Sequence, residues 1–475
     1  MPKPSLRRKL EFNWTLILIV VMALFLRLFG LTNSLTDWHS FRQADTASVT
    51  REYVKHGIDL LHPTYQDLGN IQSGLENPNG YRMVEFPFIN AGLAAILRTF
   101  PALDLVILSR LFSILCSLGT VVSLYYLGKR WANPAVGYLS AFVFASLPYA
   151  VYYSRVILPE PSFTFFVTFA ILAFDFWLEE RKWKWYGLSF IAFTLALLLK
   201  PFALFFAPIL AYLAVRHFKG RVFRQPALYL YGLTLVPLIW WRTWIQQFPA
   251  GIPASTWLFN GDGIRLRPAW FRWLGWERYT KMILGGANIV VLLSLVKKDK
   301  MRELIVVWGL CVLTYLVVIA TGNVRHDYYQ SITLPLVALA MGQGLWVIYH
   351  FFHMRKQQWI GLTLTTLFLI GSILVSREFV AGFYGTRADW EQAGAAIDRL
   401  TPTDAKVIAP AMSDTALLFQ TNRTGWTLGG EIEKKIEQGA TYYVNTAYDD
   451  EAKALEQRYQ VIEKTPNHII IKLSP

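Results

Sequence analysis

The chain has 475 residues; 54% are hydrophobic, only 16% are charged, and the formal net charge is +14. Soluble domains carry about 25% charged residues, and disordered chains combine low hydrophobicity with high charge. The composition therefore excludes a disordered chain, and the presence of only two cysteines excludes a small disulfide scaffold. Because apolar runs of about 20 residues recur along the chain, the sequence predicts a multi-pass membrane protein.

The positive charge of a soluble protein could indicate a nucleic-acid partner. In this chain, however, Lys and Arg cluster in short connections between apolar segments, as the positive-inside rule describes for the cytoplasmic side of a membrane. We therefore expect the lipid bilayer, and no nucleic acid, as a partner.

The first apolar segment, Trp14–Leu31, follows four basic residues, Lys3, Arg7, Arg8 and Lys9. A cleaved signal peptide starts in a similar way, but this segment is longer than a usual signal-peptide core and lacks a small-residue cleavage site. We interpret it as a retained first span with a cytoplasmic N-terminus. The eleven predicted spans are Trp14–Leu31, Leu105–Leu127, Pro134–Tyr153, Ser162–Leu178, Trp185–Leu199, Pro201–Val215, Ala227–Ile245, Met282–Val296, Leu304–Thr321, Ile332–Phe351 and Trp359–Val375.

One further apolar segment, Phe86–Phe100, is not counted as a span, because counting it would reverse the orientation of everything that follows. Without it, the predicted cytoplasmic side carries 19 Lys and Arg residues, whereas the short connections on the other side carry only Arg155, Lys200 and Arg325. The charge asymmetry therefore favours a re-entrant or interfacial helix on the outer face.

The predicted organisation has two parts. Residues 1–380 form a transmembrane catalytic domain with two long outer loops, 32–104 and 246–281. Residues 383–475 alternate helical and strand patterns, which is typical of a small α/β domain. An odd number of spans places this domain on the periplasmic or extracellular side of the cell (inner) membrane.

Ionisable residues at the outer edge of the membrane are the most informative, since charge at membrane depth usually serves a site. Asp37, His39, Arg42 and Asp45 follow the first predicted span, and Glu85 precedes the re-entrant segment. Two alternatives stay open: a solvated polar loop for the first four, and a carboxylate favoured by a helix dipole for Glu85.

Later spans add further polar residues at the same face. Glu160 could simply cap the next helix beside Pro161, and Lys200 could extend its amine to the interface from an apolar helix. Arg110 and Asp175 are the clearest charges inside the spans. The polar residues at the outer ends of the later spans are Arg155, Glu160, Lys200, Arg325, His326 and Tyr328.

Sugar transfer at a membrane surface needs this combination of groups. A carboxylate can take a proton from an acceptor hydroxyl as general base. Lys, Arg and His can stabilise the charge of a departing phosphate, and an apolar groove can hold a lipid tail. A proton-coupled transporter would place its charges nearer the midplane and in repeated halves, and the sequence has no such repeat.

The order of motifs resembles one enzyme superfamily. An acidic loop after the first span is followed by "EFP", by "SRxxxxE" after the third span and by "RHDYYxxxxLP" before a late span. Over roughly residues 10–340 this pattern resembles the GT-C superfamily of polyprenyl-phosphate-sugar glycosyltransferases. It is similar above all to family 39-like bacterial enzymes, which are related to protein O-mannosyltransferases and the lipid A aminoarabinose transferase.

The resemblance implies roles for individual residues. The base would be an Asp of the first outer loop, Asp37 or Asp45, with Glu160 at a position where the family usually has Asp. The donor phosphate would be held by Lys200, Arg325, His326 and Tyr328, with His39, Arg42, Glu85 and Arg155 as further site residues. Some relatives bind a divalent metal ion, so Mg, Mn or Zn at Glu85 and His326 stays open.

We therefore expect an integral membrane glycosyltransferase that moves a hexosyl or pentosyl group from a polyprenyl-phosphate donor to a hydroxyl acceptor of a lipid, glycan or protein on the outer face. A transporter or flippase of lipid-linked sugars is the alternative from another class, and an inactive scaffold is a third. The sugar and the acceptor are not specified by the sequence.

Overall fold

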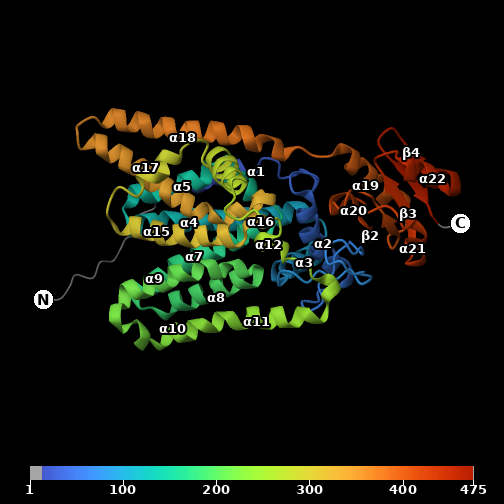
Figure 1. Ribbon diagram of the computed structural model, residues 1–475, viewed down its shortest axis with the longest axis horizontal. Coiled ribbons are helices and arrows are strands. Elements are labelled where there is room, and N and C mark those ends of the chain that lie inside the picture. The colour runs from blue at the N-terminus through green and yellow to red at the C-terminus, as the bar shows by residue number, and fades with distance from the viewer. Residues whose placement is uncertain (1–12, 474–475) are drawn as a thin grey trace.

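The computed structural model of the protein describes residues 13–473. Long helices run side by side in a bundle, and a smaller domain lies at one end of it (Figure 1). The helices of the bundle are α1 (Trp14–Leu28), α4 (Leu105–Trp131), α5 (Pro134–Ser146), α6 (Pro148–Tyr153), α7 (Pro159–Glu180), α8 (Trp183–Leu199), α9 (Ala207–Phe218), α10 (Pro226–Tyr231), α11 (Leu235–Trp244), α14 (Asn288–Leu293), α15 (Lys300–Val318), α17 (Leu334–His353) and α18 (Gln358–Val380).

Each apolar range predicted to span the membrane contains helix in the structure. Within residues 13–473, six helical segments are long and apolar enough to cross a bilayer, and shorter apolar helices accompany them. The prediction of a helical membrane protein is therefore confirmed. The four basic residues before the first span lie outside the described residues.

The helix ends follow from local sequence. Asp104 accepts a hydrogen bond from the Ile107 amide at the start of α4, and Asp299 accepts one from the Arg302 amide at the start of α15. Such caps satisfy amides that have no partner within the helix. Proline begins α5 and α7, where its fixed φ suits the first turn and its missing N–H costs nothing.

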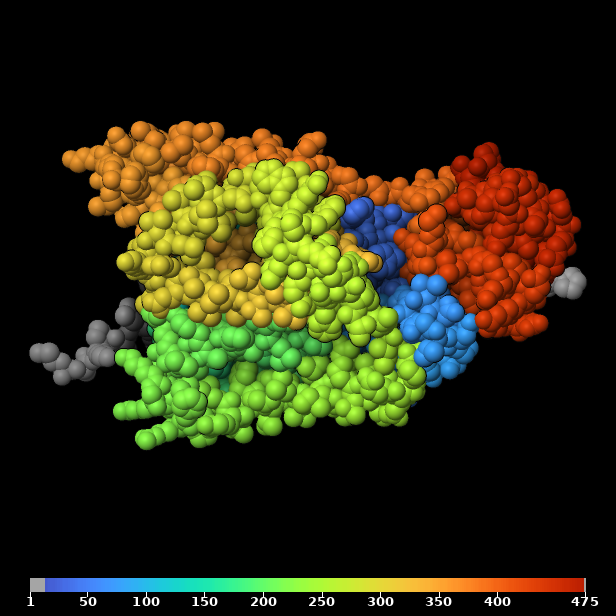
Figure 2. Space-filling view, in the orientation of Figure 1, coloured from blue at the N-terminus to red at the C-terminus, as the bar shows by residue number. Residues whose placement is uncertain are grey.

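The first outer loop contains two helices, α2 (Ser40–His56) and α3 (Phe88–Thr99). α3 has 12 residues, too few for the roughly 20 that a span needs. It matches the expected re-entrant or interfacial segment in position. The loop covers one end of the bundle, next to the C-terminal domain (Figures 1 and 2).

The second outer loop and the late spans contain irregular helix. The short helices of the second outer loop include α12 (Trp257–Asn260), α13 (Pro268–Phe271) and the π-helix η6 (Arg272–Ile283). Between α15 and α17 lie α16 (Ala320–Arg325) and the 3₁₀ helix η7 (Asp327–Thr333). π-helices are rare and occur frequently near functional sites.

The C-terminal domain is a five-stranded sheet with helices, as predicted. Its strands pair in the order β2-β1-β3-β5-β4, with β1 parallel to β2 and β3 and with β5 antiparallel to β3 and β4. α18 leads into this domain along the edge of the bundle (Figure 1). The elements are α19 (Ala388–Leu400), β1 (Lys406–Ile408), α20 (Thr415–Gln420), β2 (Thr424–Trp426), α21 (Ile432–Glu437), β3 (Ala440–Asn445), α22 (Asp450–Arg458), β4 (Gln460–Lys464) and β5 (Ile469–Lys472).

The first outer loop is joined to this sheet through its backbone. The Leu68 amide donates to the Gly425 carbonyl at 2.7 Å, and the Gly425 amide donates to the Gln66 carbonyl at 2.9 Å. Residues around Asp67 thereby extend the edge at β2 in parallel. A Cβ at position 425 would lie 1.8 Å from the Val407 carbonyl oxygen, so glycine is needed there.

Candidate active site

Two largely buried ion pairs lie at the end of the bundle next to the C-terminal domain (Figure 1). Lys200, which follows α8, donates to Glu160 in the first turn of α7. Arg42 of α2 donates to Glu85, which precedes α3. The two pairs lie within electrostatic range of each other, and the charge of Lys200 adds to that of Arg42 in lowering the pKa of Glu85.

Glu85 has the more open carboxylate of the two pairs, with 17% of its side chain exposed against 1% for Glu160. Burial alone would raise the pKa of Glu85, but Arg42, with Lys200 and Arg82, holds it below its ordinary value. Glu85 also lines a small cavity between the first outer loop and α4, α7 and α8, next to Thr46 and Asn90.

Lys200 lies among aromatic rings. Its Nζ is 4.9 Å from the ring centre of Tyr329 and 5.7 Å from that of Tyr328, so both rings support the cation. The second oxygen of Glu160 is buried and has no hydrogen-bond partner among the described residues. This cluster therefore leaves one carboxylate oxygen of Glu160 without a donor.

A third cluster centres on Asp327, which begins η7. Its carboxylate contacts the His39 Nε2 atom and accepts hydrogen bonds from Trp38 Nε1 at 3.1 Å and from the Tyr153 hydroxyl at 2.8 Å. Arg278 of the π-helix η6 lies 3.6 Å away. Asp327 belongs to the "RHDYY" cluster of the sequence, between the candidates His326 and Tyr328, but no role was predicted for it.

Asp37 is held by two buried arginines. Its Oδ2 lies 2.7 Å from Arg155 Nη2 and 3.4 Å from Arg110 Nη2, and its Oδ1 accepts a hydrogen bond from Gln43. The Asp37 side chain is fully buried. This geometry fits an anchor between the first outer loop, α4 and the segment before α7 better than a base that receives a proton from a substrate.

Asp45 is also fully engaged. Its Oδ2 lies 2.9 Å from Arg82 Nη2 and accepts a hydrogen bond from Gln72, and its Oδ1 accepts one from the Thr415 hydroxyl at 2.7 Å. Thr415 begins α20, so Asp45 ties the helix α2 to the C-terminal domain. Its position fits a role in holding that domain over the site.

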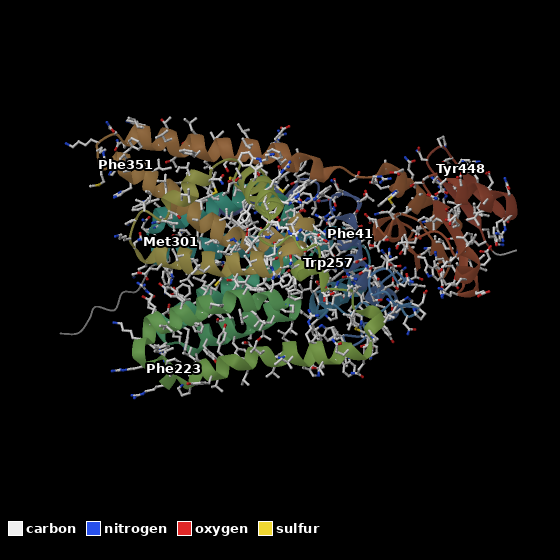
Figure 3. All side chains as sticks on the ribbon, in the orientation of Figure 1. Phe41, Phe223, Trp257, Met301, Phe351 and Tyr448 are labelled. Atoms are coloured by element: carbon white, nitrogen blue, oxygen red, sulfur yellow. The ribbon has the colours of Figure 1, made fainter. Side chains whose placement is uncertain are left out.

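Arg325 and His326 are adjacent in sequence, but their side chains lie in different surroundings. Arg325 is exposed and forms a bidentate pair with Asp262 of the second outer loop, at 2.8 and 2.6 Å. The ring of His326 contacts those of Tyr328, Phe41 and Trp257; the last two mark this end of the bundle in Figure 3. Burial, with the nearby His39, lowers the pKa of His326 to about 4, so this ring is neutral at pH 7.

The donor atoms around Glu85 and His326 do not form a ready metal site. Within residues 13–473, no group of three or more His, Cys, Asp or Glu side chains is placed to share an ion. One Glu85 oxygen is bound to Arg42, whose positive charge opposes a cation there. The mechanism proposed below therefore uses no metal.

The junction between the first outer loop and the C-terminal domain carries a pH-sensitive group. Burial raises the pKa of Asp67 from 3.8 to about 7, and the nearby Asp45 adds to this effect. Between these two values the unfolded carboxyl is ionised and the folded one is protonated. Stability should therefore fall as the pH rises from 4 to 7 and stay at the lower level above.

We expect Asp67→Asn, which is neutral at every pH, to raise the melting temperature at pH 8 and to flatten its decrease between pH 5 and pH 8. The amide keeps an oxygen for the Gly69 amide, which now donates to Asp67 at 2.9 Å. Asp59→Asn is the matched control, because that side chain is 57% exposed on the same loop. An unchanged pH dependence in Asp67→Asn would contradict the assignment.

Known structures share this architecture. The ArnT protein of Cupriavidus metallidurans without ligand superimposes with a TM-score of 0.69 at 13% identity, over 97% of both chains. The same protein bound to undecaprenyl phosphate gives a TM-score of 0.66 at 13% identity, over 97% of this chain and 98% of that one. The chain has a GT-C fold.

Two further comparisons agree with the GT-C fold. The archaeal oligosaccharyltransferase AglB of Archaeoglobus fulgidus, in complex with an inhibitory peptide and a dolichol-phosphate, gives a TM-score of 0.59 at 11% identity, over 91% of this chain and 69% of that one. Residues 92–244 match the family model described as dolichyl-phosphate-mannose-protein mannosyltransferase. No curated protein matches the chain by sequence.

Proposed function

We propose that this GT-C protein transfers a sugar from a polyprenyl-phosphate carrier to a hydroxyl acceptor at the outer face of the membrane. The acceptor oxygen attacks the anomeric carbon, the bond from that carbon to the phosphate oxygen breaks, and polyprenyl phosphate leaves. Two neighbouring ion pairs, Lys200–Glu160 and Arg42–Glu85, carry the proposal. They place two cations close together, each beside a carboxylate.

The two cations suit a phosphate. Each now faces a carboxylate, which an arriving phosphate can replace as the partner of the positive charge. An apolar groove of about 430 Å³ runs along α9, and its lining includes Leu204, four residues after Lys200. Phe193, Leu210 and Val215 also line this groove, which suits an isoprenoid chain.

Phosphate binding would also prepare the base. When Arg42 turns to the phosphate, Glu85 loses the partner that holds its pKa down, and its burial then raises the proton affinity. Glu85 has exposed surface and borders a cavity, so an acceptor hydroxyl can reach it. We therefore propose Glu85 as the general base, with Asp37 and Asp45 as anchors of the loop that carries Arg42.

Two relatives of similar fold support the lipid carrier as a substrate class. One has been solved with undecaprenyl phosphate and another with a dolichol-phosphate, both of which are polyprenyl-type phosphates. The deciding experiment incubates the purified protein with a polyprenyl-phosphate sugar and a panel of hydroxyl acceptors. A transferase produces polyprenyl phosphate; a transporter or an inactive scaffold leaves the donor intact.

The proposal also predicts which cation holds the phosphate. We expect Lys200→Gln to weaken binding of polyprenyl phosphate by about 10- to 100-fold, since a hydrogen bond to a charged group contributes about 1.5–3 kcal/mol. Arg325→Gln should bind like the wild type, because Arg325 is exposed and paired with Asp262. Carrier affinity is measured by titration in detergent.

Removal of Lys200 leaves Glu160 buried without its partner, which could unfold the protein rather than the site. The double variant Lys200→Gln with Glu160→Gln removes both charges and keeps the packing. Its carrier affinity should be as low as that of Lys200→Gln alone. Wild-type affinity in the folded double variant would place the phosphate elsewhere.

A further inference from the structure

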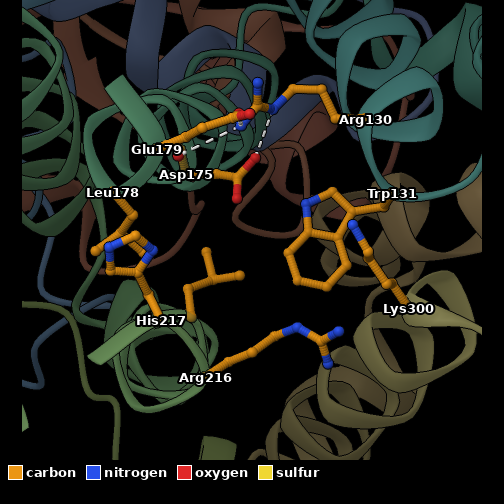
Figure 4. Close-up of a pocket in the computed structure, with 9 residues that line it drawn as sticks. Arg130, Trp131, Asp175, Leu178, Glu179, Arg216, His217 and Lys300 are labelled. Carbon is orange, nitrogen blue, oxygen red and sulfur yellow. Dashed lines mark hydrogen bonds and ion pairs between the residues drawn. The ribbon is translucent and has the colours of Figure 1, made fainter. Parts of the chain in front are cut away.

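A second polar cavity lies at the other end of the bundle, away from the C-terminal domain. It measures about 440 Å³, within the roughly 300–1,000 Å³ of ligand pockets. Its walls come from the ends of α4, α7 and α9 and from the start of α15 (Figure 4). The lining residues are Arg130, Trp131, Asp175, Leu178, Glu179, Leu213, Arg216, His217 and Lys300.

One side of this cavity is already neutralised. Arg130 lies 2.6 Å from Asp175 and 2.5 Å from Glu179, so one guanidinium is shared by two carboxylates (Figure 4). Asp175, one of the two clear charges inside the predicted spans, thus has a partner. This side fixes the ends of α4 and α7 together and leaves no unpaired cation.

The remaining charged groups are cationic. Lys300 has no ion-pair or hydrogen-bond partner within residues 13–473, and its side chain borders the cavity. Arg216 lies over the ring of Trp131 at 5.6 Å and shares its charge with Glu303, outside the lining. The unpaired ammonium of Lys300 and the guanidinium of Arg216, which is paired with Glu303, therefore both line the cavity.

The surroundings indicate what would occupy the space. The connections at this end carry many further Lys and Arg residues, and the cavity opens where membrane-spanning helices end. Basic pockets between such helices bind lipid head groups that carry phosphate. We propose that this cavity binds the phosphate of an anionic phospholipid in the leaflet at this end, with Lys300 and Arg216 as its ligands.

The test uses the full chain in detergent and measures binding of phosphatidylglycerol by native mass spectrometry. We expect Lys300→Gln to weaken this binding about fivefold, the effect of one cation near a membrane surface. Lys298→Gln is the matched control, because Lys298 is an exposed lysine of the same connection, outside the cavity. An equal loss in both variants would mean general attraction by the basic surface and would overturn the proposal.

A variant of opposite sign separates a ligand site from a structural one. Glu303→Gln removes the carboxylate that competes for Arg216, so phosphatidylglycerol should bind about two- to fivefold more tightly. Unchanged or weaker binding would count against Arg216 as a ligand. A competition experiment with glycerol 3-phosphate completes the test. If glycerol 3-phosphate displaces phosphatidylglycerol at equal concentration, the cavity binds soluble phosphates and the lipid assignment is wrong.

Discussion

Glu85→Gln is expected to lower the rate of sugar transfer by about 100-fold or more, while the affinity for polyprenyl phosphate stays the same or rises. The first effect follows because the amide cannot take the proton of the acceptor hydroxyl. The second follows because Arg42 then has no carboxylate partner and is free for the phosphate. Single-turnover rates and carrier titrations measure the two effects separately.

The control for this experiment is Asp59→Asn, an exposed carboxylate of the same outer loop that is paired with His62. It should transfer sugar at the wild-type rate. If Glu85→Gln is also as fast as the wild type and Asp45→Asn is inactive although folded, the base is Asp45, as the family resemblance allows. Loss of carrier binding in Glu85→Gln would instead make Glu85 part of the phosphate site.

Asp37→Asn is expected to cost about 3–5 kcal/mol of unfolding free energy, because it leaves Arg110 and Arg155 buried without their common carboxylate. Asp389→Asn breaks a partly exposed surface pair with Arg387 and should cost less than about 1 kcal/mol. Denaturation in detergent compares the two variants. An Asp37→Asn protein that is as stable as the wild type but inactive would restore Asp37 as the candidate base.

Composition and charge were sufficient to predict most of the fold. Apolar runs located the helices, and the asymmetry of Lys and Arg excluded residues 86–100 as a span, where the structure has the short helix α3. In the C-terminal domain, β2 has only three residues, and β4 has only two apolar residues, between a polar first residue and a charged end. Such strands have too little periodicity to be recognised, since their burial comes from neighbours in the sheet.

The site was predicted as a set of residues at one face, but not as a set of pairs. Which carboxylate neutralises which cation depends on contacts between residues far apart in the chain, such as Arg155 with Asp37 across 118 positions. Asp327 had no predicted role, because its contacts with His39, Trp38 and Tyr153 form only in the folded chain. The assignment of Arg325 to the phosphate rested on the family resemblance, whereas its partner in the structure, Asp262, lies on another loop.

The attachment of the first outer loop to the C-terminal sheet has a consequence for biosynthesis. Asp45 and Thr415 are 370 positions apart. At about 5–20 residues per second, a ribosome needs roughly 20–70 s to make the chain between them. During this interval the helix α2 lacks its partner domain, and charged side chains that the complete fold buries, such as those of Arg51 and Asp45, are open to water. A chain that ends before the C-terminal domain would therefore leave polar groups of this loop exposed that the complete fold buries.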